Sequence, residues 1–593
     1  MFLRKAKKAK PAAYVITEAE TAASLRPETA PATRHVRARS GRQRQTERAK
    51  TRILMCAVVF VFVFASLGVR LAFISFGQIK AEAPRATAPS IEAPRAEITD
   101  RNGALLATDL PMISLEVAGR EIWDARETAQ KLLSVLPDID AVELEQKLRR
   151  GRYVDLRGNL TPAERQAVFD LGLPGIHFAT RIKRFYPQAD LAAHVVGHEE
   201  PGKGGVMGLE KVANDWRGGR TMRASIDIRV QQIVEDELAA AITKFSAKAG
   251  WAGVMDVATG EVIALASLPD FDPNAPGAAA ADSRRNRATL DQYELGSAFK
   301  AFTAAAALEE GLAGEATNYD ARGSFFVADH EVTDFHGENR ILTLSEVVQY
   351  SSNIGIARVA GDLGSKRQRE YLGKLGLLTR LTMELPERRA PGLPERWGPV
   401  ETATIAYGHG ISVTPLHLLT AFCAVVNGGE FHDPTFFAEP KRVSARAVFS
   451  NQTSAVMRRI LRRVITDGTA SQAEAPGYFP IGKTATADKP LNGGYDRNTR
   501  IASFVGAVPG YAPRYAILVS LDEPQPLKET YGYATAGWTA APVFSRIVAR
   551  AAPFLGLTPV NEATALAGFV SGDQTADTPR KAAASAPIVE RAP

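Results

Sequence analysis

Cysteine is almost absent from this chain, since only Cys56 and Cys423 occur among 593 residues. Two cysteines so far apart provide neither the clustered spacing of a zinc site nor the paired spacing of a disulfide framework. Cys56 lies in an uncharged apolar run, and Cys423 lies in the apolar run 418–426, where a small buried thiol is the ordinary interpretation. We therefore expect a fold that depends on its hydrophobic core.

Other ligand signatures are missing as well. There is no glycine-rich phosphate loop, so no nucleotide is implied, and no nucleic-acid-binding motif accompanies the net charge of +7. His194 and His198 are four residues apart, but Gly197 weakens a helix between them and no third ligand follows. The remaining histidines show no ligand spacing either, among them His330, His336 and His409. We expect no metal ion and no cofactor.

Charge is missing from one long stretch near the N-terminus. Residues 53–69 carry no charged side chain, and after Arg70 the chain is apolar again to residue 76. A membrane-spanning helix needs about 20 residues, so residues 53–76 suffice if the long side chain of Arg70 extends to the interface. The preceding segment is rich in Lys and Arg, whereas the following flank is nearly neutral. The positive-inside rule then keeps the N-terminus in the cytoplasm and exports the rest.

A cleavable signal peptide is the alternative to an uncleaved anchor. Ala81-Glu82-Ala83 resembles a small-x-small cleavage site. However, the region before the apolar run is 52 residues long, and the run itself exceeds the roughly 7–15 residues of a typical signal peptide. We therefore expect an uncleaved, single-pass anchor.

Composition divides the chain into five parts. We predict a basic cytoplasmic tail at 1–52, a transmembrane anchor at 53–76, a domain of short strands and helices at 77–220 that begins with an Ala/Pro-rich linker, a larger domain at 221–557, and a disordered tail at 558–593. In the larger domain a β-hairpin is predicted where Ala258-Thr259-Gly260 joins the runs AGVMDV and EVIALASL. Strands that lead into a long helical segment indicate an α+β domain on an antiparallel sheet.

The first motif with chemical potential is Ser297-Ala298-Phe299-Lys300, at the start of an Ala-rich stretch that is predicted to be a buried helix. The spacing of three places Ser297 and Lys300 on one helix face, within hydrogen-bonding reach. A serine hydroxyl becomes an effective nucleophile when a neighbour takes its proton, and a lysine can do this if burial lowers its pKa toward neutrality. Gly296 suits a tight helix entry, where backbone N–H groups can stabilise an oxyanion.

The second motif is Ser351-Ser352-Asn353, which lies between two helical runs. A serine and an asparagine two residues apart on a loop can reach the same site. Ser351 could relay a proton to the leaving group, and Asn353 could hydrogen-bond a substrate amide. Both residue types are common in loops, so this triplet alone is weak support.

The third motif is Lys483-Thr484-Ala485-Thr486, which is followed by two strand-like runs. A strand that carries Lys483 and Thr484 beside the nucleophile can bind a substrate carboxylate. The backbone N–H of Thr486 can supply a second donor to an oxyanion. The three motifs in this order form a signature of serine acyl-enzymes.

With these motifs the chain resembles the class B penicillin-binding proteins, most closely the division-specific FtsI type. The resemblance covers residues 50–550 and includes Arg95 with Asp100-Arg101-Asn102-Gly103, Arg184-Phe185-Tyr186-Pro187, Gly205-Val206-Met207-Gly208-Leu209-Glu210, Ser225-Ile226-Asp227, Tyr293-Glu294-Leu295-Gly296-Ser297 and Gly408-His409-Gly410. It implies an α+β chain with an N-terminal transmembrane helix, an elongated β-rich pedestal domain, and a serine D,D-peptidase domain of β-lactamase type, with a five-stranded antiparallel sheet flanked by helices. In the pedestal, Arg95, Arg184 and Glu210 are expected to form structural ion pairs.

The resemblance also implies an activity and partners. The protein would be a peptidoglycan D,D-transpeptidase of the bacterial inner membrane that cross-links stem peptides of the septal wall through a serine acyl-enzyme. The implied partners are stem peptides ending in D-Ala-D-Ala, β-lactams as covalent inhibitors, a SEDS-type glycosyltransferase and other division membrane proteins, and no nucleic acid. The implied site residues are Ser297 as nucleophile, Lys300 as its base, Ser351, Asn353 and Lys483 as further catalytic residues, and Thr484 and Thr486 as substrate-binding or oxyanion residues.

One position departs from the family pattern, because Ala485 stands where the third motif usually has glycine. An added methyl group can displace the strand, and displacements near 1 Å can lower rates about a hundredfold. We expect activity that is reduced or has altered β-lactam affinity. A division scaffold with a weakened active site and an elongation-type transpeptidase remain alternatives. A soluble β-lactamase fits less well with an anchor and a pedestal, and no E-x-x-x-N pattern of its deacylation loop follows Ser297 in the chain.

Overall fold

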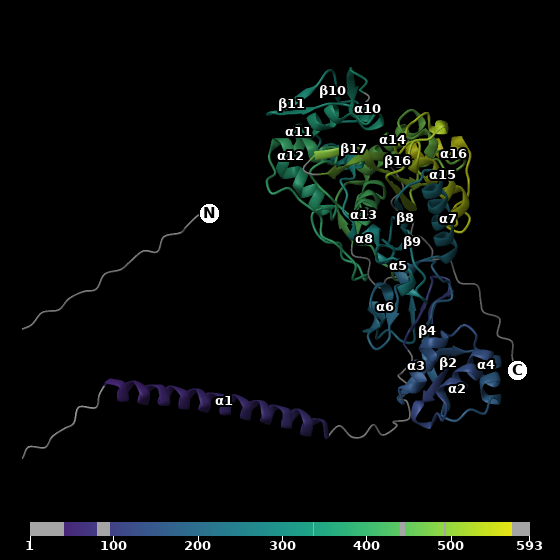
Figure 1. Ribbon diagram of the computed structural model, residues 1–593. Helices are drawn as coiled ribbons and strands as arrows, with labels where there is room; N and C mark the ends of the chain where they lie inside the picture. Colours follow the sequence, from purple (N-terminus) through teal and green to yellow (C-terminus); the bar gives the residue numbers. More distant parts are fainter. Residues whose placement is uncertain (1–40, 80–94, 336, 439–444, 492–493, 572–593) are drawn as a thin grey trace, which may run out of the picture. The chain divides into compact units, whose positions relative to one another are not determined.

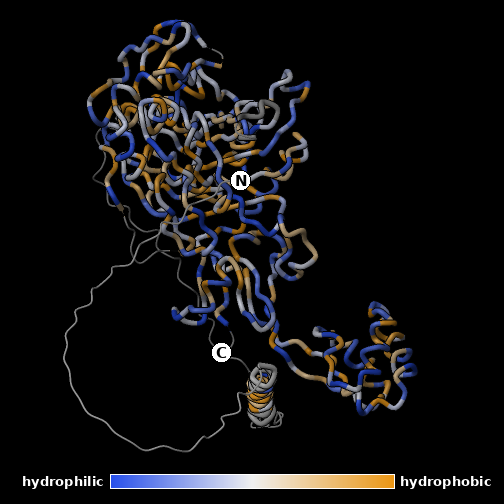
Figure 2. Tube along the Cα trace, turned by 60° about the vertical axis from the view of Figure 1, so that its left-hand side comes forward, coloured by the Kyte–Doolittle hydropathy of each residue, from blue (hydrophilic) through white to orange (hydrophobic). Residues whose placement is uncertain are grey.

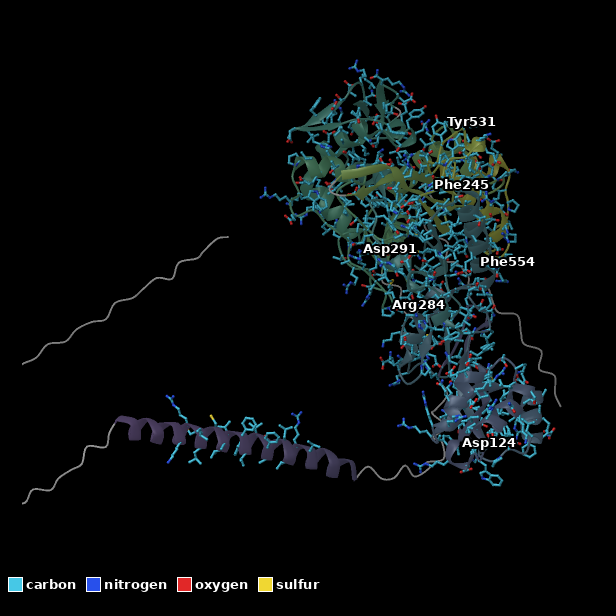
Figure 3. All side chains as sticks on the ribbon, viewed as in Figure 1. Asp124, Phe245, Arg284, Asp291, Tyr531 and Phe554 are labelled. Atoms are coloured by element: carbon cyan, nitrogen blue, oxygen red, sulfur yellow. The ribbon has the colours of Figure 1, made fainter. Side chains whose placement is uncertain are left out.

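The computed structural model describes residues 41–79, 95–335, 337–438, 445–491 and 494–571. The chain forms two compact units, residues 1–90 and 91–593. In the first unit the described residues form the helix α1 (Gly41–Ile79), and its segment Arg52–Leu71 is long and apolar enough to cross a membrane. Large apolar side chains project from α1 along this segment (Figure 3), as expected of a helix that is hydrophobic all round. The predicted anchor at 53–76 lies within α1; residues 1–40 and 80–94, which hold most of the predicted tail and linker, lie outside the described residues.

Strand β2 (Leu105–Ala118) organises the first part of the second unit. It pairs antiparallel with β1, β3 and β4, and β1 in turn pairs in parallel with β7. The other strands of this part are β1 (Glu97–Thr99), β3 (Tyr153–Leu160), β4 (Ile176–Phe185), β5 (Glu199–Glu200), β6 (Gly204–Gly205) and β7 (Thr221–Arg223). Strand β7 follows the predicted boundary at residue 220, so the sheet takes its last strand from the next part of the chain.

Helices α2 (Ala125–Val135), α3 (Ala141–Arg149) and α4 (Pro162–Asp170) form a separate small core with β2. Leu115 and Val117 of β2 are buried in this core with apolar residues of the helices. Each helix begins at a side chain that accepts backbone N–H groups, which satisfies donors that the helix itself cannot pair. The capping residues are Asp124 (Figure 3), Asp140 and Thr161. Two short helices, α5 (Ala193–Val196) and α6 (Gly208–Ala213), complete this part.

The second part is built on a five-stranded antiparallel sheet of order β16-β17-β18-β8-β9. This confirms the predicted antiparallel sheet and the predicted hairpin. The strands are β8 (Ala249–Asp256), β9 (Val262–Leu268), β16 (Ile481–Leu491), β17 (Gly494–Val508) and β18 (Tyr515–Asp522). Strands β8, β9, β16 and β17 of this sheet are labelled in Figure 1. Strand β16, which contains the third motif, lies at the end of this order.

Helices cover both faces of this sheet. In β8, Gly250 faces Leu238 of α7 (Ile228–Lys244), whereas Gly253 faces Leu419 of α13 (Pro415–Val426). Because side chains alternate along a strand, α7 and α13 lie on opposite faces, and α15 (Ala540–Ala551) packs beside α7. Every residue of α13 is buried, and hydrophobic stretches gather inside this part of the molecule (Figure 2).

The remaining elements include the Ala-rich helix α9 (Phe299–Glu309), which contacts α10, α11, α12, α13 and α14. Small side chains let these helices approach closely, and alanine also favours the helix itself. The elements are α8 (Arg287–Leu290), η4 (Gly296–Ala298), β10 (Asn318–Asp320), β11 (Phe325–Val327), β12 (His330–Val332), β13 (Ile341–Thr343), α10 (Leu344–Gln349), α11 (Asn353–Lys374), α12 (Pro399–Ala406), β14 (Glu430–His432), β15 (Ala445–Ala447) and α14 (Asn451–Thr466).

The end of the described chain differs from the prediction. Disorder was expected from residue 558, and this is wrong for α16 (Glu562–Ser571). Ala565 of this helix is buried, and Phe569 packs edge-on against Tyr511 with ring centroids 6.2 Å apart. The composition of the last residues, rich in Pro and charge, concealed a short apolar stretch that can bury one face. Residues 572–593 lie outside the described residues.

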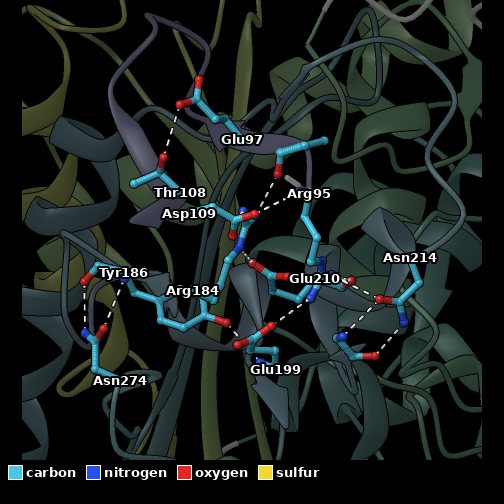
Figure 4. Close-up of polar contacts among 12 residues, drawn as sticks. Arg95, Glu97, Thr108, Asp109, Arg184, Tyr186, Glu199, Glu210, Asn214 and Asn274 are labelled. Atoms are coloured by element: carbon cyan, nitrogen blue, oxygen red, sulfur yellow. Dashed lines mark hydrogen bonds and ion pairs between the residues drawn. The ribbon is translucent and has the colours of Figure 1, made fainter. Parts of the chain in front are cut away.

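A buried ion-pair network ties β4, α6 and the segment before β1 together (Figure 4). The Nε of Arg184 donates to Oε1 of Glu210 at 2.7 Å, and its Nη1 lies 3.1 Å from Oδ1 of Asp109. Arg95 pairs with Glu210 at 2.8 Å and with Glu199 at 3.2 Å. The side chains of Arg184 and Glu210 are completely buried, so each charge depends on the other for its compensation.

Replacement of Glu210 by glutamine leaves Arg184 buried without its main counter-charge. We expect Glu210→Gln to lower the free energy of unfolding by about 3–5 kcal/mol, measured by urea denaturation of the full chain in detergent. Glu200, in an exposed pair with Lys203, provides the control, because Glu200→Gln should leave stability nearly unchanged. Equal effects of the two substitutions would contradict a dominant role for burial.

Candidate active site

The first motif forms the turn that leads into α9. Ser297 lies in η4, half exposed, and Lys300 lies in the first turn of α9 with its side chain completely buried. The Nζ of Lys300 donates to Oγ of Ser297 at 3.0 Å. The predicted pair is therefore in hydrogen-bonding contact, with Ser297 partly exposed and the amine of Lys300 buried.

Ser351 connects the first and third motifs. It lies between α10 and α11, and its Oγ accepts from Nζ of Lys300 and from Nζ of Lys483, both at 3.0 Å. Lys300 also donates to the carbonyl oxygen of Ser351. A continuous hydrogen-bonded path thus runs from Ser297 through Lys300 and Ser351 to Lys483.

Burial sets the charge of the two lysines. Transfer out of water lowers the pKa of Lys300 to about 7, although the negative charge of Asp334 acts in the opposite direction. Burial, and after it the charge of Lys300, holds the pKa of Lys483 well below its usual range. A neutral amine is therefore accessible beside Ser297 near neutral pH, which is what a proton acceptor requires.

Strand β16 presents the third motif on its two faces. Because side chains alternate, Lys483 and Ala485 share one face, and Thr484 and Thr486 share the other. The Oγ1 of Thr484 lies 2.7 Å from Oγ1 of Thr469, and Oγ1 of Thr486 accepts from the backbone N–H of Ala536 at 3.1 Å. Thr484 also contacts Lys483, whose Nζ donates to its carbonyl oxygen at 3.2 Å.

Ala485 is accommodated without a break in the strand. Pairing between β16 and β17 continues in one register from Ile481 to Asp488, and Ala485 lies opposite Ser503. The alanine side chain is only 2% exposed. Lys483 still reaches Ser351 at hydrogen-bonding distance, so the methyl group does not separate the third motif from the other two.

Comparisons with known proteins agree with this geometry. The family model for the penicillin binding protein transpeptidase domain matches residues 250–549, and that for the penicillin-binding protein dimerisation domain matches residues 90–203. The chain is 38% identical over 535 residues to a probable peptidoglycan D,D-transpeptidase FtsI of Caulobacter vibrioides, covering 87% of this chain and 91% of the relative. It is 31% identical over 556 residues to a probable peptidoglycan D,D-transpeptidase PenA of Neisseria meningitidis, covering 87% and 94%.

A third relative is peptidoglycan D,D-transpeptidase FtsI of Escherichia coli, which is 28% identical over 495 residues, covering 77% of this chain and 83% of the relative. The chain belongs to the class B penicillin-binding proteins. The resemblance stated from the sequence is thereby confirmed. The part that includes β1–β4 corresponds to the dimerisation domain, and the part built on the five-stranded sheet corresponds to the transpeptidase domain.

Asn353 of this penicillin-binding protein is held by the segment that follows β12, a contact that the sequence did not reveal. Its Nδ2 donates to the carbonyl oxygen of Thr333 at 2.9 Å. The carboxylate of Asp334 accepts from Oγ of Ser352 at 2.7 Å, from the backbone N–H of Ile354 at 3.0 Å, and from the N–H of Asn353. Asp334 thus binds the N-terminus of α11, where a negative charge is favourable. An isolated aspartate in a loop gives no sequence signal for this role.

Two glycines, Gly296 and Gly408, meet next to Ser297. A β-carbon added to Gly408, which has a φ of +82°, would lie 2.1 Å from the carbonyl oxygen of Gly296. Only glycine permits this approach. Two residues later the backbone N–H of Gly410 donates to Oε1 of Glu294 at 3.0 Å. The segment that follows α12 therefore supports the turn that carries Ser297.

Among the described residues, no group of three or more His, Cys, Asp and Glu side chains is arranged to hold a metal ion. The chemistry available at the site is that of hydroxyl and amine groups and backbone N–H donors.

We expect Gly408→Ala to lower the rate constant for acylation by a fluorescent penicillin by on the order of 100-fold, because the methyl group must displace the Ser297 turn. Gly556 provides a matched control, since it also has a positive φ, +64°, but no atom within 4 Å of an added β-carbon. Gly556→Ala should acylate like the unmodified protein. A similar loss in both variants would indicate backbone strain and not contact with Gly296.

Proposed function

We propose that the protein is the septal peptidoglycan D,D-transpeptidase of its bacterium, and that it acts through an acyl-enzyme on Ser297. The observation that carries this proposal is the hydrogen-bonded path from Ser297 through Lys300 and Ser351 to Lys483. Membership of the penicillin-binding family supports the activity. The β-lactamase-type fold of the catalytic domain, with boundaries at 221–557 after a pedestal at 77–220, belongs to the same proposal.

In the first step Lys300 takes the proton of Ser297, and Oγ attacks the carbonyl carbon of the penultimate D-Ala. The oxyanion is stabilised by the backbone N–H groups of Ser297 and Thr486. The close approach of Gly296 and Thr486 supports this assignment, because a β-carbon on Gly296 would lie 3.2 Å from the carbonyl oxygen of Thr486. Preorganised N–H donors of this kind typically contribute about 10²–10³ in rate.

The leaving D-Ala amine receives its proton from Ser351, which Lys300 and Lys483 replenish. Lys483 and Thr484 bind the terminal carboxylate, and Asn353 hydrogen-bonds the stem peptide. The acyl group then passes to the amine of a second stem peptide, so that the amide bond broken supplies the energy of the amide bond formed. β-Lactams acylate Ser297 by the same first step.

The setting of the reaction follows from α1. We propose that α1 remains as an uncleaved anchor in the inner membrane, with the basic N-terminus in the cytoplasm and the catalytic domain in the periplasm. A SEDS-type glycosyltransferase and other division proteins are the proposed membrane partners. An elongation role is the second candidate, because an anchor, a pedestal and this site suit it equally well.

Lys300 should govern the pH dependence of acylation. Only the neutral amine can take the proton of Ser297, so the acylation rate constant should fall about tenfold per pH unit below the Lys300 pKa of about 7 and level off above it. We expect Lys300→Met to lower acylation about 10²–10⁴-fold. Stopped-flow acylation by a fluorescent penicillin across the pH range measures both effects.

Ser297→Ala provides the control, since it should abolish the labelled band altogether. Absence of labelling in the unmodified protein would favour a scaffold with a weakened site. Rapid loss of label by hydrolysis would favour a β-lactamase. A rate constant that stays level from acidic to neutral pH would contradict the role given to Lys300.

Depletion in living cells tests the septal role. Loss of a septal transpeptidase blocks division while growth continues, so depleted cells should become filaments. Re-expression of the unmodified chain should restore division, whereas Ser297→Ala at the same level should not. Rounded cells would support elongation, and rescue by Ser297→Ala would support a scaffold.

A further inference from the structure

His409 is placed beside the nucleophile by both of its neighbours in the chain. Gly408 approaches the carbonyl oxygen of Gly296, and Gly410 donates to Glu294. The residue is therefore anchored on both sides to the segment that ends in Ser297. Its side chain is only partly buried, and its ring packs edge-on against Tyr407 with centroids 5.2 Å apart. The ring is thus not sealed inside the core.

Charged and titratable groups from four other elements surround this ring. Glu294 precedes η4, Lys300 belongs to α9, Asp488 belongs to β16 and His330 belongs to β12, and each of them acts on the charge of His409. Tyr407, which packs against the ring of His409, also contacts the β11–β12 hairpin, because its hydroxyl lies 3.4 Å from Nε2 of His330. His409 therefore lies where the nucleophile turn, strand β16 and the β11–β12 hairpin converge.

These surroundings suit a group that gains and loses a proton. Burial lowers the pKa of His409 below its ordinary value, so the ring is neutral at neutral pH and can accept a proton. Glu294 and Asp488 favour the protonated ring once it forms. Lys300 and His330 oppose it, which favours onward transfer of the proton to water.

The transfer half of the reaction needs such an acceptor. The attacking amine arrives as an ammonium with three hydrogens and ends as an amide nitrogen with one. One of the two protons lost returns to Oγ of Ser297 when the ester bond between Oγ and the acyl carbon breaks. The other proton is released overall. It must leave before the C–N bond forms, because an ammonium has no lone pair.

We propose that His409 accepts this first proton from the incoming ammonium and so generates the amine that attacks the acyl-enzyme. The proposal rests on the transpeptidase function above and adds a base that is separate from Lys300 and Ser351. Lys300 and Ser351 handle the proton that returns to Ser297. His409 handles the proton that leaves the enzyme, and it is needed only when the acceptor arrives as a protonated amine.

The test measures how the acyl-enzyme divides between transfer and hydrolysis. The full chain in detergent is given a small thioester donor with either glycine or hydroxylamine as acceptor. The amine of glycine is protonated at neutral pH, whereas that of hydroxylamine is not. We expect His409→Gln to lower the ratio of transfer to hydrolysis with glycine by on the order of 100-fold, the size of a typical general-base effect. The ratio with hydroxylamine should change little.

His177 offers a matched control, because it lies half exposed in β4, near Glu121 and away from the site. His177→Gln should leave both ratios unchanged. An unchanged glycine ratio in His409→Gln would overturn the proposal. So would an equal loss with both acceptors, since that result indicates a change in the shape of the site.

The pH profile of the unmodified protein provides a second test that needs no variant. With His409 as the base, the rate of acyl transfer to glycine stays constant as the pH rises from the pKa of His409 to the pKa of the glycine amine. Without it, transfer rises about tenfold per pH unit over that range, because only the free amine attacks. A rising profile overturns the inference while an acyl-enzyme still forms. Failure to form any acyl-enzyme overturns the proposed function and the inference together.

Discussion

Two buried lysine side chains donate to one hydroxyl, and the catalytic part of this protein depends on that arrangement. Each Nζ lies 3.0 Å from Oγ of Ser351, so the two nitrogens lie within about 6 Å of each other. At that distance two positive charges repel by about 3 kcal/mol at the effective dielectric constant typical of proteins. Burial and repulsion together make a doubly charged pair unfavourable. The site therefore provides an amine in contact with Ser297 that can be neutral at neutral pH.

The three motifs can be recognised in the sequence because each of them is short and local. The spacing of Ser297 and Lys300 needs only a helix start, and the hairpin of the antiparallel sheet needs only short apolar runs joined by turn residues. The distance between Ser351 and Lys483 was not predictable, since it depends on how α10 and β16 pack across α14. The roles of Asp334 and of the Gly408–Gly296 contact had no local pattern, because both arise between segments far apart in the sequence.

Ala485 shows how a sequence departure can be judged only in its packing. From the sequence, an added methyl group on the binding strand raised the possibility of a displaced strand and a weakened site. In the fold, the methyl group is buried on the same face as Lys483, and the ladder with β17 keeps its register through the motif. The disorder predicted from residue 558 was wrong for residues 562–571. Composition alone does not reveal that the ring of Phe569 packs against the ring of Tyr511.

Serine at position 351 suits the hydrogen bonds of its hydroxyl group but does not suit the backbone conformation that it adopts. Its φ of 63° lies in the left-handed region, where a non-glycine residue costs of order 1–3 kcal/mol unless its surroundings impose the conformation. Asparagine or glycine would suit that backbone better. Neither carries a hydroxyl that can receive a hydrogen bond from both lysines and pass a proton on. The loop thus retains a residue that destabilises its own conformation, and proteins of this family should tolerate substitutions that relax this turn only at the expense of turnover.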